Sequence, residues 1–200
     1  MIKPKILGNL NHGLAFIISA PAGTGKTTLV EMLKKEFPCI VESISYTTRK
    51  PRVNEINGRD YFFVSEEEFK EKIKKKEFLE YAEVFGQYYG SSKEFVSQQR
   101  AKGNHVVLVI DVQGAKKLRK HGFIFIFIAP PTIQELQYRL HSRKSETETM
   151  IQKRLSWAQK EIDEAKKYDY HVINEDLDTA YQVLRSVFIA EEHKVNQKNE

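Results

Sequence analysis

Short apolar runs alternate with amphipathic stretches along most of the chain. These runs predict buried strands at residues 14–18, 39–44, 105–110, 123–128 and 171–173. Strands that are apolar on both faces are typical of a parallel sheet covered by helices on both sides, so the pattern predicts a three-layer α/β fold with a mostly parallel sheet. Helical spacing of apolar residues predicts helices at residues 26–37, 111–120, from 132 onward, 150–167 and 177–193.

The pattern changes between residues 46 and 95. Aromatic and loop residues are frequent there, and a capping box from Ser65 to Glu68 predicts one helix. The 200 residues of the chain correspond to roughly one and a third domains at about 150 residues per domain. We therefore interpret residues 46–95 as an insertion into a single domain.

The remaining residues divide into a core, a lid and a tail. A second capping box, from Thr132 to Glu135, opens a short charged stretch, residues 132–149, that we interpret as the lid. Residues 194–200 are polar and are expected to form a frayed tail. The predicted core consists of residues 1–45, 96–131 and 150–193.

Composition narrows the class of protein without identifying it. The formal net charge of +5 fits nucleic acid, anionic lipid or a phosphorylated small molecule as a partner. No apolar run approaches the roughly 18 residues that cross a bilayer, and the run at 14–18 is too short for a secretory signal. The single cysteine excludes an intrachain disulfide, so we expect Cys39 to be a reduced core or near-core residue of a cytoplasmic protein.

The sequence APAGTGKT at residues 20–27 matches the phosphate-loop pattern except at its first position, where Ala20 replaces glycine. A predicted strand precedes it and a predicted helix follows, so its backbone N–H groups can form an anion nest at a helix N-terminus. An ordinary glycine-rich turn is the alternative, but Lys26 can bridge the β- and γ-phosphates and the Thr27 hydroxyl can ligate Mg²⁺. The motif therefore predicts a nucleoside triphosphate site. The residues expected to bind ATP here are Ala22, Gly23, Thr24, Gly25, Lys26, Thr27 and Thr28.

A phosphate loop alone is compatible with switches, motors and kinases. The insertion adds Arg49 and Arg52, three residues apart, with Pro51 between them opposing a regular helix. Paired guanidinium groups can bind a phosphate dianion in a bidentate manner, which favours a second phosphate site. A solvated basic loop is the alternative.

Several further segments resemble the guanylate kinase family of phosphate-loop nucleoside monophosphate kinases. They are SYTTRKPRVNEINGRDYFF at 45–63, FLEYA at 78–82, YYGS at 88–91, IDVQG at 110–114 and SETE at 145–148. The resemblance extends from about residue 14 to 193. It implies Mg²⁺-dependent transfer of the γ-phosphoryl group of ATP to GMP, in purine nucleotide metabolism and GMP recycling.

The resemblance also implies which residues of the insertion bind GMP. Glu80 and Ser91 would hold the guanine. A carboxylate only accepts hydrogen bonds, and guanine offers N1–H and an amino group side by side, whereas adenine has an acceptor at N1. Ser91 can donate to guanine O6. The alternatives are a solvated carboxylate at position 80 and core packing for the aromatic residues. The residues implied to bind the GMP phosphate are Ser45, Arg49, Arg52, Tyr61 and Tyr89.

Asp111 follows a predicted strand, at the sheet edge where parallel α/β proteins bind ligands. The resemblance places it beside GMP and Mg²⁺, which it would contact directly or through water. Family members often carry another acidic residue two positions earlier, but this chain has Val109. The metal site is therefore expected to have one carboxylate fewer.

The resemblance assigns the remaining roles to the lid and its surroundings. Arg143 and Arg154 would close over the transferred phosphoryl group, joining Lys26 and Arg49 as catalytic residues. Arg139 would lie beside ATP and Asn174 near its adenine. The alternatives are ion pairs of the arginines with Glu146 or Glu148 at the surface, and a helix-capping role for Asn174.

Three rival functions remain at this level: a kinase with another acceptor, a non-catalytic interaction module on the same fold, and a nucleic-acid-binding protein. Glu80 and Ser91 oppose the first, and the Lys26–Thr27 pair opposes the second. Basic and acidic residues alternate, as in KEKIKKKE at 70–77, which opposes the third. We expect ATP and GMP as substrates, Mg²⁺ as cofactor, and no nucleic acid, membrane or obligate protein partner.

Overall fold

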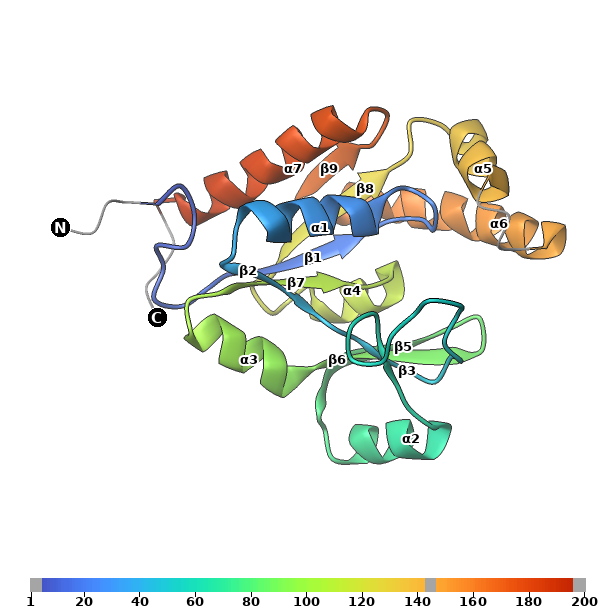
Figure 1. Cartoon of the computed structure of the whole chain (residues 1–200), viewed down its shortest axis with the longest axis horizontal. Coiled ribbons are helices and arrows are strands. Elements are labelled where there is room, and N and C mark those ends of the chain that lie inside the picture. Colours follow the sequence, from blue (N-terminus) through green and yellow to red (C-terminus); the bar gives the residue numbers. More distant parts are fainter. Residues whose placement is uncertain (1–4, 143–146, 196–200) are drawn as a thin grey trace.

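A five-stranded parallel sheet forms the centre of the molecule (Figure 1). The computed structural model describes residues 5–142 and 147–195. All four neighbouring strand pairs in this sheet run parallel, as the apolar runs predict. In spatial order the strands are β2 (Ile40–Ser43), β7 (His105–Val109), β1 (Ala15–Ser19), β8 (Ile124–Ala129) and β9 (Tyr170–Ile173).

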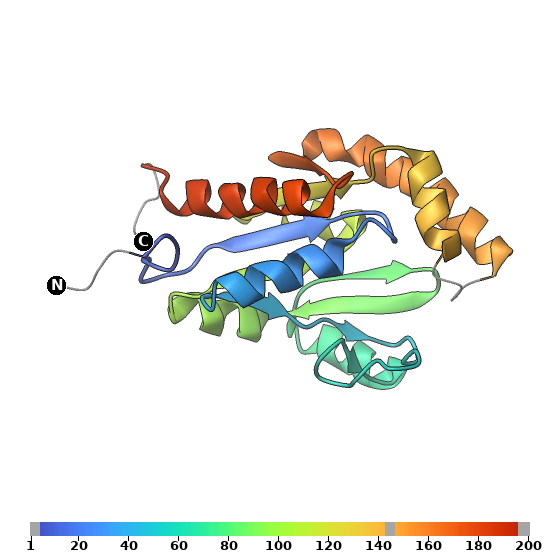
Figure 2. The same ribbon diagram turned by 45° about the horizontal axis from the view of Figure 1, so that its top comes forward.

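Helices cover both faces of this sheet (Figure 2). Alternate residues of β1 divide between the two faces: Phe16 and Ile18 pack with α1 (Lys26–Glu36) and α7 (Leu177–Glu192). On the opposite face Ile17 packs in a cluster that includes residues of α3 (Lys93–Ala101) and α4 (Val112–Leu118). Because all five residues of β1 are buried, the strand that leads into the phosphate loop is held on both sides. Two further helices follow β8 along the chain: α5 (Ile133–Ser142) and α6 (Glu148–Glu164). Helix α6 continues into the 3₁₀ turn η1 (Ala165–Lys167).

A second, four-stranded sheet lies within residues 46–92. Its long members, β5 (Phe78–Val84) and β6 (Gln87–Ser92), form an antiparallel hairpin. Helix α2 (Glu66–Lys74) packs on this sheet through Phe69, whose ring centroid lies 4.5 Å from that of Phe78. The short strands β3 (Tyr46–Thr47) and β4 (Phe62–Phe63) complete the order β4-β3-β6-β5. Helix α3 crosses the predicted boundary between residues 95 and 96.

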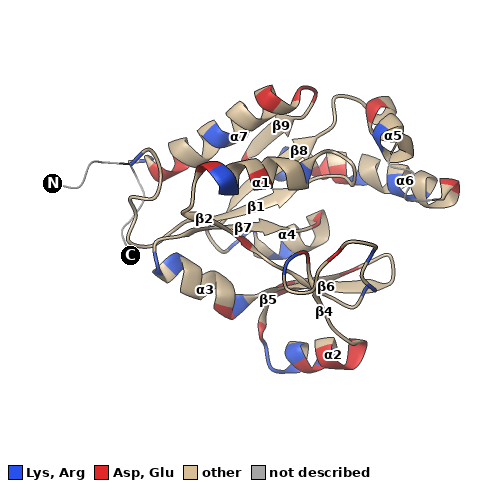
Figure 3. Cartoon of the chain, in the orientation of Figure 1, with Lys and Arg blue, Asp and Glu red and all other residues tan. Residues whose placement is uncertain are grey.

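Side chains cap the helices where the sequence predicts that they start. The Ser65 hydroxyl accepts a hydrogen bond from the N–H of Glu68 at 3.1 Å, and the Thr132 hydroxyl accepts one from the N–H of Glu135 at 3.0 Å. Asp111 is the cap of α4, rather than its first residue. Along α2, basic and acidic residues alternate and pair, as in Lys70–Glu66 (Figure 3).

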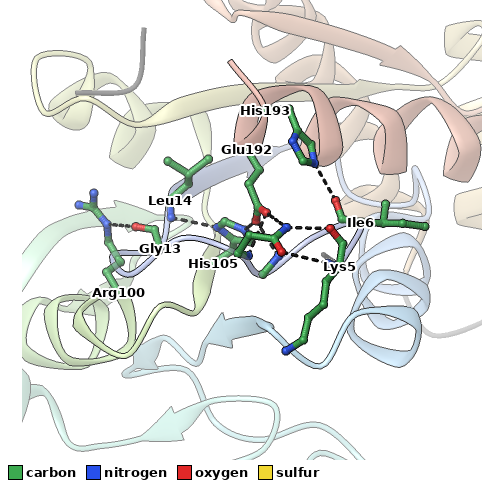
Figure 4. A network of polar contacts seen from close by, with 10 residues as sticks. Lys5, Ile6, Gly13, Leu14, Arg100, His105, Glu192 and His193 are labelled. Atoms are coloured by element: carbon green, nitrogen blue, oxygen red, sulfur yellow. Dashed lines mark hydrogen bonds and ion pairs between the residues drawn. The ribbon is translucent and has the colours of Figure 1, made fainter. Parts of the chain in front are cut away.

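A polar network joins the segment before β1 to the end of α7 (Figure 4). The Glu192 carboxylate accepts hydrogen bonds from the N–H groups of Gly8 at 2.6 Å and Asn9 at 3.0 Å, and lies 2.5 Å from His105 Nε2. The N–H of Leu14 donates to His105 Nδ1 at 3.0 Å. Since Nδ1 accepts, Nε2 carries the proton, and His105 is the neutral tautomer that donates to Glu192.

Within the described ranges, no helix is long and apolar enough to cross a membrane.

Candidate active site

The phosphate loop joins β1 to α1 through Gly25, which has a φ of +88°. A Cβ at this position would lie 2.5 Å from Asn174 Nδ2, so both the backbone conformation and the available space require glycine. Among the described residues, no side chain caps the N-terminus of α1, in contrast to α2, α3, α4 and α7. The first N–H groups of α1 therefore remain available to an anion.

Lys26 begins α1 and points back along the loop. Its Nζ donates to the carbonyl oxygen of Ala20 at 3.3 Å. Burial lowers the pKa of Lys26, and the carboxylates of Glu161 and Asp111 oppose that shift by attraction. Thr27 and Thr28 follow on the exposed first turn of the helix, whereas Thr24 is fully buried. The loop thus places one half-buried lysine beside an uncapped helix end.

Asn174 and Arg139 meet beside the phosphate loop. The Asn174 side-chain amide donates to the carbonyl oxygen of Thr24 at 2.5 Å, and Arg139 Nη1 donates to the carbonyl oxygen of Asn174 at 2.9 Å. Asn174 is therefore not a helix cap; Asp176 caps α7 instead, by accepting from the N–H of Thr179. Arg139 pairs with Glu135 at 2.8 Å, on its own helix.

Glu80 and Ser91 stand opposite each other on β5 and β6, and both are buried. Ser91 Oγ donates to Glu80 Oε1 at 2.7 Å. Burial raises the pKa of Glu80 to about 7. The alternative of a solvated carboxylate is therefore wrong for this residue, whose exposed fraction is 5%.

Glycine at position 114 allows Glu80 to approach α4. A Cβ on Gly114 would lie 2.4 Å from Glu80 Oε2. One oxygen of the Glu80 carboxylate thus accepts a hydrogen bond from Ser91. The other oxygen lies against α4, the core helix that Asp111 caps. An aromatic-rich strand pair and a core helix together fix the direction of this carboxylate.

Arg49 lies among aromatic rings at the start of the insertion. Its guanidinium carbon is 5.3 Å from the ring centroid of Tyr61, which in turn makes an edge contact with Tyr89 at 5.9 Å. Ser45 is buried at the beginning of the same segment. The structure therefore brings together Arg49, Tyr61 and Tyr89, three of the residues implied to bind the GMP phosphate.

Glu55 is a residue that sequence reasoning missed. Its carboxylate pairs with Arg49 Nη2 at 2.9 Å and accepts from the N–H of Arg52 at 2.7 Å. It thereby holds the loop that carries both arginines. Glu55 is a single acidic residue in an irregular loop, so no periodicity or motif in the sequence indicates it as a functional residue.

Glu161 on α6 was missed as well. It is 7% exposed, and burial raises its pKa against the attraction of Lys26 and Arg154. Arg154 and Glu161 are seven residues apart, which places them on one helix face. The seven-residue spacing from Arg154 was the signal in the sequence that could have indicated Glu161. Arg143 and the first two residues of the segment SETE, Ser145 and Glu146, lie outside the described residues.

Thr27 and Asp111 offer hydroxyl and carboxylate oxygens, the donor types that Mg²⁺ prefers. Among the described residues, no group of three or more histidine, cysteine or acidic side chains could enclose a metal ion. One Asp111 oxygen also accepts from the N–H of Gly114 at 2.9 Å. This donor set fits an ion that takes most of its ligands from phosphate and water.

The parallel sheet, the phosphate loop after its first strand and the separate arginine and carboxylate site define a kinase of the phosphate-loop class. The guanylate kinase family model matches residues 13–191. The guanylate kinase of Protochlamydia amoebophila is 54% identical over 192 residues, covering 96% of this chain and 98% of the relative. The chain belongs to the guanylate kinase family.

More distant relatives agree with this assignment. The guanylate kinase of Caldanaerobacter subterraneus subsp. tengcongensis is 44% identical over 191 residues, covering 94% of this chain and 93% of the relative. The crystal structure of guanylate kinase from Anaplasma phagocytophilum superposes with a TM-score of 0.76 at 33% identity, covering 96% of this chain and 91% of that one. The similarity therefore extends over nearly the whole chain.

Proposed function

We infer that this chain is an ATP:GMP phosphotransferase, which converts ATP and GMP to ADP and GDP in purine nucleotide metabolism and GMP recycling. The choice of acceptor rests above all on the buried pair of Glu80 and Ser91. A carboxylate held in a desolvated position is complementary to the adjacent N1–H and amino group of guanine. Adenine would leave that carboxylate unpaired, and sites built on such hydrogen bonds discriminate by roughly 10⁴-fold.

On the donor side, the ATP phosphates bind the N-terminus of α1 and the loop from Ala22 to Thr28. Lys26 faces the β- and γ-phosphates from its half-buried position, where phosphate oxygens join the carboxylates that already favour its charged form. Asn174 and Arg139 lie beside the same loop, and we assign Asn174 to the adenine and Arg139 to ATP.

On the acceptor side, the GMP phosphate binds Arg49, Arg52, Tyr61, Tyr89 and Ser45. Glu55 holds the Arg49 guanidinium group in place before GMP arrives, so less side-chain motion is lost on binding. Arg49 then neutralises charge on the acceptor phosphate while Glu80 holds the base. The phosphate oxygen that attacks is oriented from both ends of the nucleotide.

Phosphoryl transfer needs little covalent chemistry from the protein. Lys26 and Arg49 would act on the transferred group from opposite substrates, and Arg154 of α6 would act on the same group. Arg143 belongs to the lid and acts with Arg154. Closing of the lid and the insertion excludes water, which limits hydrolysis of ATP.

Mg²⁺ is the proposed cofactor, and it neutralises charge on the β- and γ-phosphates when bound. Thr27 would hold it through its hydroxyl, and Asp111 through its carboxylate or an intervening water. With valine at position 109, Asp111 would be the acidic residue that fixes the ion at this edge of the sheet.

A coupled ADP-release assay tests the function. It offers GMP, dGMP, AMP, CMP and UMP in turn, with ATP and Mg²⁺. We expect turnover with GMP and a rate with AMP lower by at least about a thousandfold. Absence of turnover with GMP, despite binding of both nucleotides, would identify a non-catalytic module and overturn the proposal.

A further inference from the structure

The tip of the β5–β6 hairpin touches helix α6. The ring centroids of Phe85 and Trp157 lie 5.6 Å apart at an interplanar angle of 58°. Lys153, one turn earlier on α6, places its Nζ 5.0 Å from the centroid of the Phe85 ring. Figures 1 and 2 both show the hairpin extending toward the side of the molecule where α5 and α6 lie. One aromatic residue of the insertion therefore contacts the helix that follows the lid.

The hairpin turn presents Phe85 at some conformational cost. Phe85 and Gly86 form the two-residue turn between Val84 and Gln87, and both have positive φ, +52° and +76°. Turns of this kind favour asparagine or aspartate followed by glycine, because a side chain in the left-handed region is strained. An aromatic residue nevertheless occupies the strained position, with 36% of its surface exposed. Strain retained at an exposed aromatic residue points to a role beyond the turn itself.

The two elements in contact carry different parts of the proposed site. The hairpin contains Glu80, Tyr89 and Ser91, which we assign to GMP. Helix α6 contains Arg154 one turn before Trp157 and Glu161 one turn after it. Electrostatic attraction connects Glu161 to both Lys26 and Arg154. The contact thus joins the acceptor-binding strands to the helix whose polar face reaches the phosphate loop.

We propose that Phe85 and Trp157 are positioning residues, through which the GMP-binding hairpin places α6 and its Arg154 over the transferred phosphoryl group. This inference rests on the proposed function. Neither ring touches a substrate in this role; each acts through the backbone that it holds. An aromatic pair with one cation–π contact changes an equilibrium constant roughly five- to thirtyfold. This is the expected size of the coupling between the hairpin and α6.

Trp157 is the only tryptophan of the chain, so its fluorescence reports on this contact directly. The experiment titrates GMP into the wild type and into Phe85→Ala, with excitation at a wavelength that guanine does not absorb, and measures GMP affinity separately by calorimetry. We expect GMP to change the emission of the wild type. In Phe85→Ala that response should be lost while GMP still binds, and kcat should fall about tenfold with a smaller change in the KM for GMP.

Phe85→Tyr keeps the ring and should restore both the fluorescence response and kcat. Val183→Ala removes a comparably exposed apolar side chain on α7 and serves as the matched control. A double-mutant cycle with Trp157→Ala then measures the coupling in kcat and, separately, in Tm. Coupling in kcat supports the inference, whereas coupling confined to Tm, or additive effects on kcat, overturns it.

A second set of outcomes separates this inference from the proposed function. If the wild type does not turn over GMP, the proposed function fails. If the wild type turns over GMP and Phe85→Ala does so with unchanged kcat and an unchanged fluorescence response, only the positioning role fails.

Discussion

Ser91 gives its single hydroxyl hydrogen to Glu80, the residue directly across the hairpin. The same hydrogen was expected to bind guanine O6, and a hydroxyl can donate only once. In the unliganded protein, Ser91 therefore holds the carboxylate. Under the proposed function, guanine would supply two donors to Glu80 and free the serine hydroxyl for O6, so the pair would exchange one internal hydrogen bond for contacts with the base.

Replacing Glu80 by glutamine should separate recognition of the two nucleotides. Glu80→Gln keeps the shape of the side chain but presents an amide N–H₂ to the guanine donors, so the KM for GMP should rise by at least about a hundredfold while the KM for ATP changes little. Steady-state kinetics with each nucleotide varied in turn measures both. Glu83→Gln, on the exposed side of the same strand, is the matched control. Equal losses for GMP and ATP would contradict the assignment of Glu80 to guanine.

The same substitution should stabilise the unliganded protein at alkaline pH. The folded-state pKa of Glu80, about 7, lies above the ordinary value of 4.5, so wild-type stability falls as pH rises through this window. The largest difference from Glu80→Gln corresponds to about 3 kcal/mol, at 1.36 kcal/mol per pKa unit. Urea unfolding of both proteins at pH 5 and pH 8 measures the change. A difference in unfolding free energy that is the same at both pH values would refute this origin of the shift.

A methyl group at position 114 should weaken the binding of GMP and leave the binding of ATP unchanged. The new carbon in Gly114→Ala would lie 2.4 Å from Glu80 Oε2, so the carboxylate must turn away from its position. We expect the KM for GMP to rise about tenfold, which corresponds to about 1.4 kcal/mol. Lys116→Ala, on the exposed side of α4, controls for changes to the helix. An unaltered KM for GMP would show that this close approach does not set the carboxylate direction.

Acid should weaken the network around His105. Burial lowers the pKa of this imidazole below its ordinary value of 6.5, so the folded state favours the neutral form. The unfolded chain takes up the proton first as pH falls, and the stability from this group, complete above about pH 6.5, is lost below it. His105→Gln should be less stable at pH 7.5 but should lose less stability between pH 7.5 and 5.5. The low pKa of Glu192 adds acid sensitivity only below this interval, near and below 4.5. Parallel stability curves for the two proteins would argue against a neutral His105.

The sequence predicted the parallel sheet well because its strands are buried on both faces. HVVLVI and FIFIFI admit few other interpretations, and the phosphate loop follows from residue types at fixed spacing. In the second sheet, β3 and β4 are two residues long each, too short for any period to show. In β5 the buried positions include Glu80 while Tyr81 is exposed, so its apolar residues do not alternate as a half-buried strand predicts. The aromatic residues of this sheet were noticed, but their partners come from other strands and from α2.

The candidate site likewise contains residues that local motifs predict and residues that only the tertiary structure brings together. Arg49, Glu80 and Asp111 belong to local motifs, which is why the family resemblance could assign them. Glu161 on α6 attracts Lys26 on α1, which is a relationship of tertiary structure that no local motif indicates. For Asn174, both a cap and a nucleotide contact were compatible with its place after a strand; Asp176 caps α7 in its place, and the nucleotide contact stays a prediction.

The joining of the first strand to the last helix has a consequence for biosynthesis. Phe16 stacks on Phe188 with ring centroids 3.9 Å apart, and Gly8 and Asn9 bind Glu192. The ribosome makes these partners long after β1, so β1 completes its packing only after α7 has been translated. A nascent chain arrested before residue 188 would contain the entire phosphate-loop sequence and yet lack the final helix face against which its leading strand is held.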